Sequence, residues 1–196
     1  MSGEVRIQPA SAEAFALVEH ALTGGGDGGS CWCRFLLGTR SAFDAASRDE
    51  KRAALREELA DAAVAPALVA TVDGAGAGWV RVAPRPAQAG VLRTRVVRSG
   101  STEPADAPDV WAVTCFVVRR EHRGAGLAAG LLAAAVAHAE AHGARAIGGY
   151  PVDRAARPEA SSAELWHGTA GLFARTGFAE TARPAPARPV MTLRVR

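Results

Sequence analysis

The most constraining feature of this sequence is a glycine-rich turn between an apolar strand and an alanine-rich helix. Val110 to Val118 is rich in β-branched and aromatic residues, which predicts a strand. From about Gly126 to His142 apolar residues recur at helical spacing, which predicts a helix packed on a sheet. The turn Arg123-Gly124-Ala125-Gly126 joins them and exposes successive backbone N–H groups at the positive end of the helix dipole. Such a turn suits a phosphate group, although the glycines also fit an ordinary tight turn.

The remaining sequence predicts a strand and helix order that extends along the whole chain. Strands are predicted at residues 4–9, 66–72, 78–83, 110–118, 144–149, 178–183 and 190–195, and helices at 11–22, 47–63, 126–142 and 161–175. Two of the helix starts carry a capping box, Ser47 with Glu50 and Ser161 with Glu164. A chain of 196 residues with this pattern predicts one domain, residues 1–196.

One segment of the chain shows no clear period. Pro84 to Asp109 contains four prolines, and only its basic, branched centre from Arg93 to Arg98 has a recognisable character. We predict a long loop here, inserted at about residues 84–109 between the third and fourth strands. Ordered loops of this length are commonly functional, although a passive surface loop is the simpler alternative.

Composition and charge exclude several classes of partner. The formal net charge is only +3, and no basic run with interleaved aromatic residues is present, so we expect no nucleic-acid partner. The longest apolar stretch, Leu127 to Ala141, carries His138 and Glu140 and falls short of the roughly 20 apolar residues that cross a bilayer, so we expect no membrane segment. The first ten residues lack the basic and apolar regions of a signal peptide, and the cysteine count is odd. We therefore expect a cytoplasmic protein with reduced thiols.

Three types of nucleotide-binding turn can be compared with this one. A Walker A loop requires Lys followed by Ser or Thr, which the turn lacks. A Rossmann turn expects an acidic residue about 20 residues later, where this chain has Gly148-Gly149-Tyr150. The third type reads Gln or Arg, two residues, Gly, any residue, Gly or Ala, and Arg123 to Ala128 fits it at every specified position. On this motif the chain resembles the GNAT superfamily of acyl-coenzyme A N-acyltransferases.

The resemblance to GNAT enzymes extends over nearly the whole chain. The predicted element order matches the family topology, and Leu172 to Phe178 is similar to the family's helix-to-strand ending. The segments Cys31-Trp32-Cys33 and Gly149-Tyr150-Pro151 also resemble an actinobacterial subgroup of the family. The resemblance implies an α/β (α+β) fold, with a mixed central sheet of about seven strands flanked by about four helices.

The resemblance also implies an activity and a set of binding residues. It implies an acetyl-CoA-dependent N-acetyltransferase that acylates a small-molecule or peptide amine by direct transfer in a ternary complex, as a monomer or homodimer. The backbone N–H of Phe116 would stabilise the oxyanion of acyl transfer. The residues implied to bind the cofactor are Phe116, Val117, Val118, Arg123, Gly124, Ala125, Gly126, Leu127, Ala128 and Ala129. Two alternatives remain, a non-catalytic acyl-CoA-binding or regulatory module and a Rossmann-like nucleotide binder.

The sequence departs from the family at its usual acid and base positions. Phe173 stands where many members have the tyrosine that protonates the leaving thiolate, and Trp166 replaces a common asparagine. Ala112 stands where some members have a glutamate base. As substitutes we consider Tyr150, the single tyrosine, and His167, although a packed tyrosine and a solvated histidine are the simpler interpretations.

The cysteines and histidines do not form a metal-ligand pattern. Cys31 and Cys33 lack a second pair, and His138 and His142 lack further ligands, so we predict no metal. Cys115 should point to the sheet face opposite Phe116, which favours inert packing over a covalent acyl-enzyme. Four large aromatic residues are candidates for an acceptor pocket, and at least two should belong to the core: Trp32, Phe35, Trp79 and Trp111.

Overall fold

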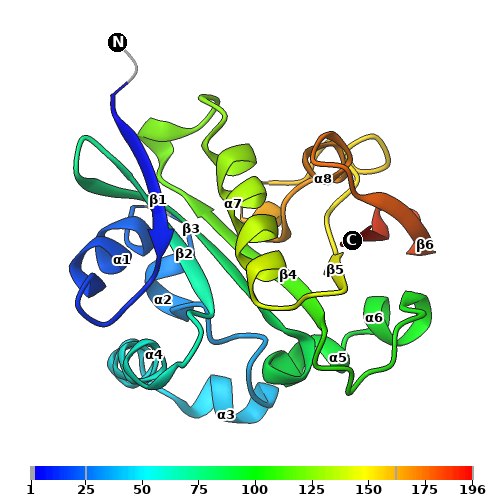
Figure 1. Cartoon of the computed structure of the whole chain (residues 1–196), viewed down its shortest axis with the longest axis horizontal. Helices are drawn as coiled ribbons and strands as arrows, with labels where there is room; N and C mark the ends of the chain where they lie inside the picture. Colours follow the sequence, from blue (N-terminus) through cyan, green and yellow to red (C-terminus); the bar gives the residue numbers. More distant parts are fainter. Residues whose placement is uncertain (1–2, 25, 162, 196) are drawn as a thin grey trace.

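The computed structural model describes residues 3–24, 26–161 and 163–195. Within these residues the chain forms one seven-stranded sheet in the order β1-β2-β3-β4-β5-β7-β6 (Figure 1). The strands are β1 (Val5–Pro9), β2 (Ala67–Val72), β3 (Ala75–Pro84), β4 (Val110–Val118), β5 (Ala146–Gly149), β6 (Ala179–Ala185) and β7 (Arg188–Arg194). The β4–β5 pair is parallel and the other neighbouring pairs are antiparallel, so the predicted mixed sheet is confirmed.

The described residues contain eight α-helices, twice the number expected. They are α1 (Phe15–Leu22), α2 (Gly28–Cys31), α3 (Arg40–Ala45), α4 (Arg48–Asp61), α5 (Ala89–Leu92), α6 (Arg95–Gly100), α7 (Leu127–Ala141) and α8 (Ala170–Arg175). Three 3₁₀ turns accompany them, η1 (Arg85–Gln88), η2 (Arg120–His122) and η3 (Leu165–His167). The additional helices α2, α3, α5 and α6 have only four to six residues, too few to show a helical period. None of the helices in the described ranges is long and apolar enough to cross a membrane.

The sheet separates two parts of the hydrophobic core. Leu68 and Ala70 of β2 face the core that α7 covers, whereas Val69 faces the core that contains α1 and α4. Side chains alternate across a strand, so a strand buried on both faces reads as an uninterrupted apolar run. Figure 1 shows α7 crossing one face of the sheet and α1, α2 and α4 gathered on the other.

Strands β4 and β5 separate halfway along β4. Their pairing runs from Val110 with Ala146 to Val113 with Gly149, where β5 ends. Residues 114–118 of β4 keep β3 as a neighbour on one side only. On the other side η3 approaches β4, and the chain that follows it makes a parallel bridge from Thr169 to Val152. The sheet is therefore open along the second half of β4.

Of the two helix starts predicted from a capping box, one is confirmed and one is corrected. Helix α4 begins at the predicted capping box, in which Ser47 Oγ accepts from the Glu50 N–H and the Glu50 carboxylate accepts from the Ser47 N–H. The Ser161 hydrogen bonds to Glu164 also form, but no α-helix begins there. Gly168 has φ +79° and separates η3 from α8, so the predicted helix 161–175 is wrong in its first half. Helix α8 is instead capped by Thr169, whose side chain accepts from the Leu172 N–H.

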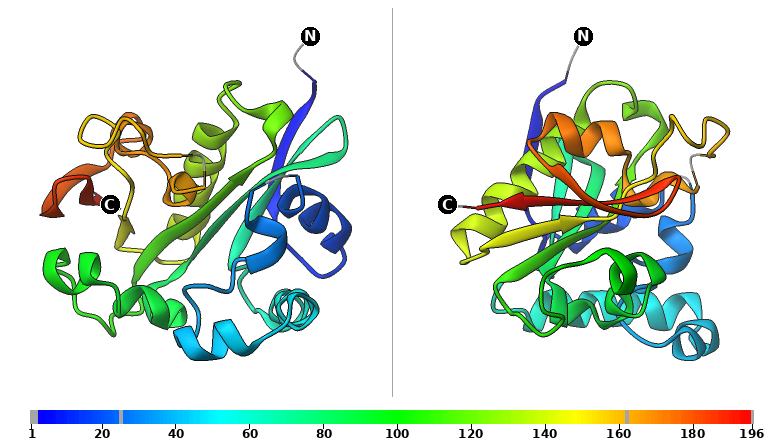
Figure 2. Two further views of the ribbon diagram at one scale, coloured as in Figure 1. Left: turned by 180° about the vertical axis from the view of Figure 1, so that it is seen from behind. Right: turned by 90° about the vertical axis from the view of Figure 1, so that its right-hand side faces the viewer.

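The segment 84–109 is not the irregular loop that we expected. It forms η1, α5 and α6 (Figures 1 and 2). Helix α5 packs beside the chain leading to α3, whereas α6 contacts β6 and β7. The Gln88 side chain is fully buried and donates to the carbonyls of Ala83 and Ala112. The Gly90 N–H donates to the Leu36 carbonyl at 2.8 Å. Tertiary hydrogen bonds of this kind order a segment whose sequence shows no period, because they satisfy its backbone polar groups.

Candidate active site

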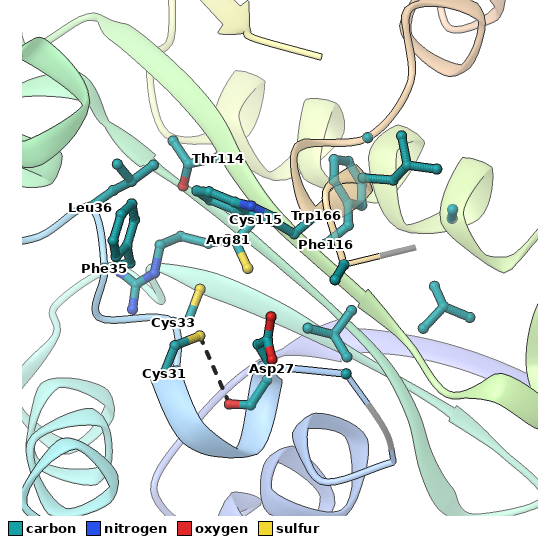
Figure 3. A pocket seen from close by; sticks show the side chains of 18 of the residues that line it. Asp27, Cys31, Cys33, Phe35, Leu36, Arg81, Thr114, Cys115, Phe116 and Trp166 are labelled. Atoms are coloured by element: carbon teal, nitrogen blue, oxygen red, sulfur yellow. Dashed lines mark hydrogen bonds between the residues drawn. The ribbon is translucent and has the colours of Figure 1, made fainter. Parts of the chain in front are cut away.

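A cavity of about 630 Å³ lies along the open half of β4. Residues 114–118 form its floor, so the cavity extends for about 13 Å at the usual rise of a strand. Its walls come from α2 and the chain that follows it, from η3, and from the start of α8 (Figure 3). The segment 84–109 contributes none of the described lining residues, so its basic centre lies outside this cavity.

One end of the cavity reaches the glycine-rich turn. Gly124 has φ +77° and Gly126 has φ +82°, a left-handed conformation that favours glycine. Among the described residues, no acceptor is present for the backbone N–H groups of residues 124–128, which therefore stay free. The Ala129 N–H, in contrast, donates to the Gly126 carbonyl at 2.9 Å, so it already has a partner within the chain. The free N–H groups and the α7 dipole make this end electropositive.

Arg123 adds a full charge to the same end. Its Nε donates to the Val118 carbonyl at 3.0 Å, which holds the side chain against the end of β4, and the guanidinium lines the cavity. Arg175, near the end of α8, lines the cavity as well. The sequence motif located Arg123, but nothing in the sequence distinguished Arg175 from other exposed arginines. Ala128 also lines the cavity, whereas Leu127 turns into the core.

The predicted β4 residues Phe116, Val117 and Val118 all line the cavity. The Phe116 ring packs edge-on against Phe173, with ring centroids 6.0 Å apart. Because β5 has ended, the backbone edge of these residues faces open space and not another strand. An extended ligand can hydrogen-bond to such an edge as an added strand would. The role of the Phe116 N–H at a thioester stays a prediction.

Comparison with known proteins agrees with this geometry. The model of the acetyltransferase (GNAT) family matches residues 35–158, which is more than half of the chain. The chain belongs to the GNAT acetyltransferase family. Acyl-coenzyme A is the donor that this family uses, and the family assigns the chain to the acyltransferases. No curated protein sequence matches this one significantly.

Solved structures of GNAT proteins share the fold at low sequence identity. The GNAT domain of PAT from S. lividans superposes with a TM-score of 0.59 at 16% identity, covering 98% of this chain and 92% of that one. PaiA N-acetyltransferase from Thermoplasma acidophilum, in complex with coenzyme A, has a TM-score of 0.55 at 11% identity, with 98% and 99% covered. YncA from Salmonella typhimurium, with its cofactor acetyl-CoA, has a TM-score of 0.53 at 15% identity, with 98% and 94% covered. These similarities establish the fold.

Tyr150 lies outside the cavity of this GNAT protein. Its side chain is 3% exposed and packs in a separate core cluster with Leu36 and Val91. Burial raises the pKa of its phenol, and the neighbouring Arg85 opposes that rise only in part. Tyr150 is therefore a protonated core residue, the simpler of its two sequence interpretations.

His167 also lies beneath the cavity wall. The ring stacks on Trp166 with centroids 3.5 Å apart, and Trp166 is the residue that lines the cavity. Burial and the nearby Arg188 guanidinium lower the pKa of His167 to about 3, so the ring is neutral at pH 7. Its Nδ1 has no hydrogen-bond partner among the described residues. The solvated histidine that we considered from the sequence is thus a buried one.

The positions that differ from the family pattern are apolar in the structure. Phe173 is fully buried, and its ring occupies the space above Gly149, where a methyl group would come within 2.1 Å of ring carbon Cε1. Ala112 is fully buried in β4. Neither position contributes an acid or a base, which agrees with the sequence analysis.

The cavity holds a polar group that the sequence analysis did not select. Arg81 of β3 is 1% exposed and lines the cavity at the end farthest from the turn. Its guanidinium makes a bidentate ion pair with Glu58 of α4, at 2.8 and 2.9 Å. The sequence did contain a signal, an arginine within the apolar run from Ala77 to Ala83. A charge in a buried strand indicates a buried partner of opposite charge, because an unpaired charge is almost never buried.

The cysteines and aromatic residues divide between core and cavity. None of the three cysteines forms a disulfide bond among the described residues, and all three line the cavity. Among the candidate aromatic residues, Trp32, Trp79 and Trp111 are core residues and Phe35 lines the cavity. Among residues 3–24, 26–161 and 163–195, no three His, Cys, Asp or Glu side chains are arranged to hold a metal ion.

Proposed function

We propose that this protein is an acetyl-CoA-dependent N-acetyltransferase that acylates an amine by direct transfer in a ternary complex. One observation carries the proposal: the open edge of β4 lines the same cavity as Arg123 and Ala128, the two residues that flank the free N–H groups of the glycine-rich turn. The amide-bearing arm of coenzyme A would lie along residues 116–118. Its pyrophosphate would bind at residues 124–128 and Arg123.

The reacting centre would then lie beside Phe116, on the side of the cavity toward Arg81. The backbone N–H of Phe116 would donate to the thioester oxygen and stabilise the charge that develops when the amine attacks. The acceptor would enter past Trp166 and Phe35, which line this part of the cavity. Tyr150 and His167 have no part in the proposed reaction, because one is a core residue and the other stays neutral.

The first prediction concerns cofactor affinity. Arg123→Ala is expected to weaken coenzyme A binding by about 10- to 100-fold, since a hydrogen bond to a charged group contributes roughly 1.5 to 3 kcal/mol. Isothermal titration calorimetry measures the affinity. Arg120→Ala is the matched control, because Arg120 is exposed and close in sequence but does not line the cavity. Equal affinities in wild type, Arg123→Ala and Arg120→Ala would exclude the proposed phosphate site.

Activity distinguishes an enzyme from a non-catalytic acyl-CoA-binding module. Acetyl-CoA is incubated with panels of amino acids, polyamines, aminoglycosides and peptides, and free thiol is measured over time. The proposal expects thiol release that depends on one class of amine. Tight coenzyme A binding with no amine-dependent release from any panel would favour the binding module.

The second prediction concerns Tyr150. Tyr150→Phe is expected to change kcat by less than a few-fold, because the hydroxyl is buried away from the cavity. The same substitution should change the free energy of unfolding by no more than about 1 kcal/mol, since it removes a single hydroxyl group and keeps the packed ring. A decrease in kcat of about 100-fold with unchanged acetyl-CoA affinity would instead identify Tyr150 as the acid that protonates the thiolate.

A further inference from the structure

Three cysteines and one arginine lie close together at the end of the cavity farthest from the glycine-rich turn. Cys31, Cys33 and Cys115 line the cavity together with Arg81 (Figure 3). The Cys33 sulfur is the centre of the group. The Trp79 indole N–H donates to it at 3.2 Å, and the Cys115 thiol and the Arg81 guanidinium lie beside it.

The positive charge of Arg81 favours an ionised sulfur at Cys33. Arg81 is paired with Glu58, but the same carboxylate also accepts from Arg34 at 2.9 Å. Two guanidinium groups therefore share one carboxylate. The Arg81 Nε has no hydrogen-bond partner among the described residues, although Arg81 is 1% exposed. A thiolate at Cys33 supplies the missing negative charge, and a buried charge is stable when it is paired in this way.

The backbone at Cys33 is held in an unusual conformation. Trp32 has φ +47° and Cys33 has φ +56°, and both lie in the left-handed region, which residues other than glycine enter at a cost. This pair ends α2 and turns the chain back toward β3 and β4. The fully buried Trp32 side chain holds the turn in place. Local strain of this kind is often found at functional sites.

The surrounding groups separate Cys33 from the other two cysteines in protonation state. Burial alone raises the pKa of Cys33, but the Cys115 hydrogen bond, the Arg81 charge and the Trp79 N–H outweigh it and lower the pKa to about 6. Burial and the neighbouring Cys33 raise the pKa of Cys31 to about 11. The pKa of Cys115 is also raised, by its hydrogen bond to Cys33 and by burial. At pH 7 Cys33 is therefore a thiolate between two neutral thiols.

We propose that the Cys33 thiolate is the base that deprotonates the acceptor amine. The proposal rests on the proposed function, since it assigns a role within that reaction. An amine in neutral water is an ammonium ion and has no lone pair with which to attack a thioester. The negative charge of Cys33 attracts the ammonium group into a cavity that is also lined by three arginines. Cys33 then accepts one proton from the ammonium group and becomes a thiol.

The transfer then balances without a further reactant. The amine lone pair forms the new C–N bond, the C–S bond of the thioester breaks, and its electron pair leaves with the coenzyme A sulfur. The second proton of the amine passes to that sulfur and gives free coenzyme A. Cys33 returns its proton to solvent through the open cavity. Asp27, at the start of α2, is the carboxylate that lines the cavity with Cys33, and it would help to attract the cationic acceptor.

The third prediction tests the ionised state of Cys33 without acetyl-CoA or an acceptor. The ultraviolet absorbance of thiolate is measured against pH in the full-length protein. Wild type is expected to show one step near pH 6 that Cys33→Ser lacks and that Cys31→Ser, the matched control, retains. Trp79→Phe removes an N–H donor and should move the step upward by about one pH unit. Identical titrations of wild type and Cys33→Ser across this range would overturn the proposal.

The same variants test the role of Cys33 in the reaction. With the best amine of the panels, Cys33→Ser should lower kcat/KM at pH 7 by about 100-fold and leave coenzyme A affinity unchanged. The loss should shrink as the pH approaches the pKa of the amine, because free amine then needs no base. Mass spectrometry after exposure to acetyl-CoA alone shows whether Cys33 becomes acetylated. An acetylated Cys33 would overturn the proposal, because it would identify Cys33 as a nucleophile and not as a base.

Two failures remain distinguishable. If wild type binds coenzyme A and shows the low-pH thiolate step but acetylates no amine, the proposed function fails together with the role of Cys33 as its base. If wild type acetylates an amine and Cys33→Ser does so at an equal rate, only the role of Cys33 fails. If Cys33→Ser does not fold, the pH dependence of kcat/KM in Trp79→Phe decides the question, because its lower limb should follow the raised pKa of Cys33.

Discussion

Replacing Phe173 by alanine is expected to lower the free energy of unfolding by about 3 to 5 kcal/mol, a large effect for a single substitution. The ring is fully buried and packs edge-on against Phe178 and Phe116, with centroids 4.9 and 6.0 Å away. Gly149 lies against the same ring and has no side chain to fill the space. Urea denaturation measures the change.

Phe173→Leu is the matched control, because it keeps most of the apolar volume and should cost clearly less than Phe173→Ala. Phe116 lines the cavity, so Phe173→Ala is also expected to weaken coenzyme A binding. A loss of stability below about 1 kcal/mol in Phe173→Ala would contradict the packing described at Gly149.

The second large effect is a loss of stability in acid that originates at His167. The pKa of His167 is lowered from 6.5 to about 3 by burial and by the Arg188 charge. Above pH 6.5 the ring is neutral in both the folded and the unfolded state. Below pH 6.5 the unfolded state takes up a proton that the folded state refuses, so stability falls until about pH 3. Between pH 7 and pH 4 this single group should cost about 3 kcal/mol.

His167→Gln isolates that contribution, because glutamine is polar and does not titrate. Glu58 adds its own acid sensitivity in both proteins. Burial raises the pKa of Glu58, but Arg81 and Arg34 outweigh burial and hold it below its usual value. The free energy of unfolding is therefore measured by urea denaturation from pH 7 to pH 4 in wild type and in His167→Gln. The difference between the two pH profiles is the contribution of His167. Parallel profiles would show that His167 is accessible to protons in the folded state.

The cofactor end of the site was predictable because it depends on local backbone structure. A turn with Gly124 and Gly126 in the left-handed region, followed at once by a helix, exposes N–H groups wherever the fold places it. The positions of most strands along the chain were predictable for a similar reason, since an apolar or alternating run is a local signal. Ala129 is left out of the proposed phosphate donors because the first turn of α7 tightens and the Ala129 N–H donates to the Gly126 carbonyl.

The acceptor end was not predictable in the same way. Arg81 and Cys115 lie in β3 and β4, and Cys33 lies in the chain just after α2. The sequence gives no sign that the three side chains meet. The segment 84–109 became helical through buried contacts of Gln88 and Gly90 with distant carbonyls. The helix propensity of a few neighbouring residues carries no information about hydrogen-bond partners that lie far away in the sequence.

The sequence by itself therefore determined the glycine-rich turn that we propose for phosphate, the succession of strands along the chain and the absence of the usual acid and base at Phe173 and Ala112. Only the tertiary structure decided where β4 parts from β5, which side chains line the cavity, and which of them carry a charge. The physical reason is that periodicity and turn chemistry act over a few residues. The pKa of Cys33 or His167 depends instead on burial and on charges from elements far apart in the chain.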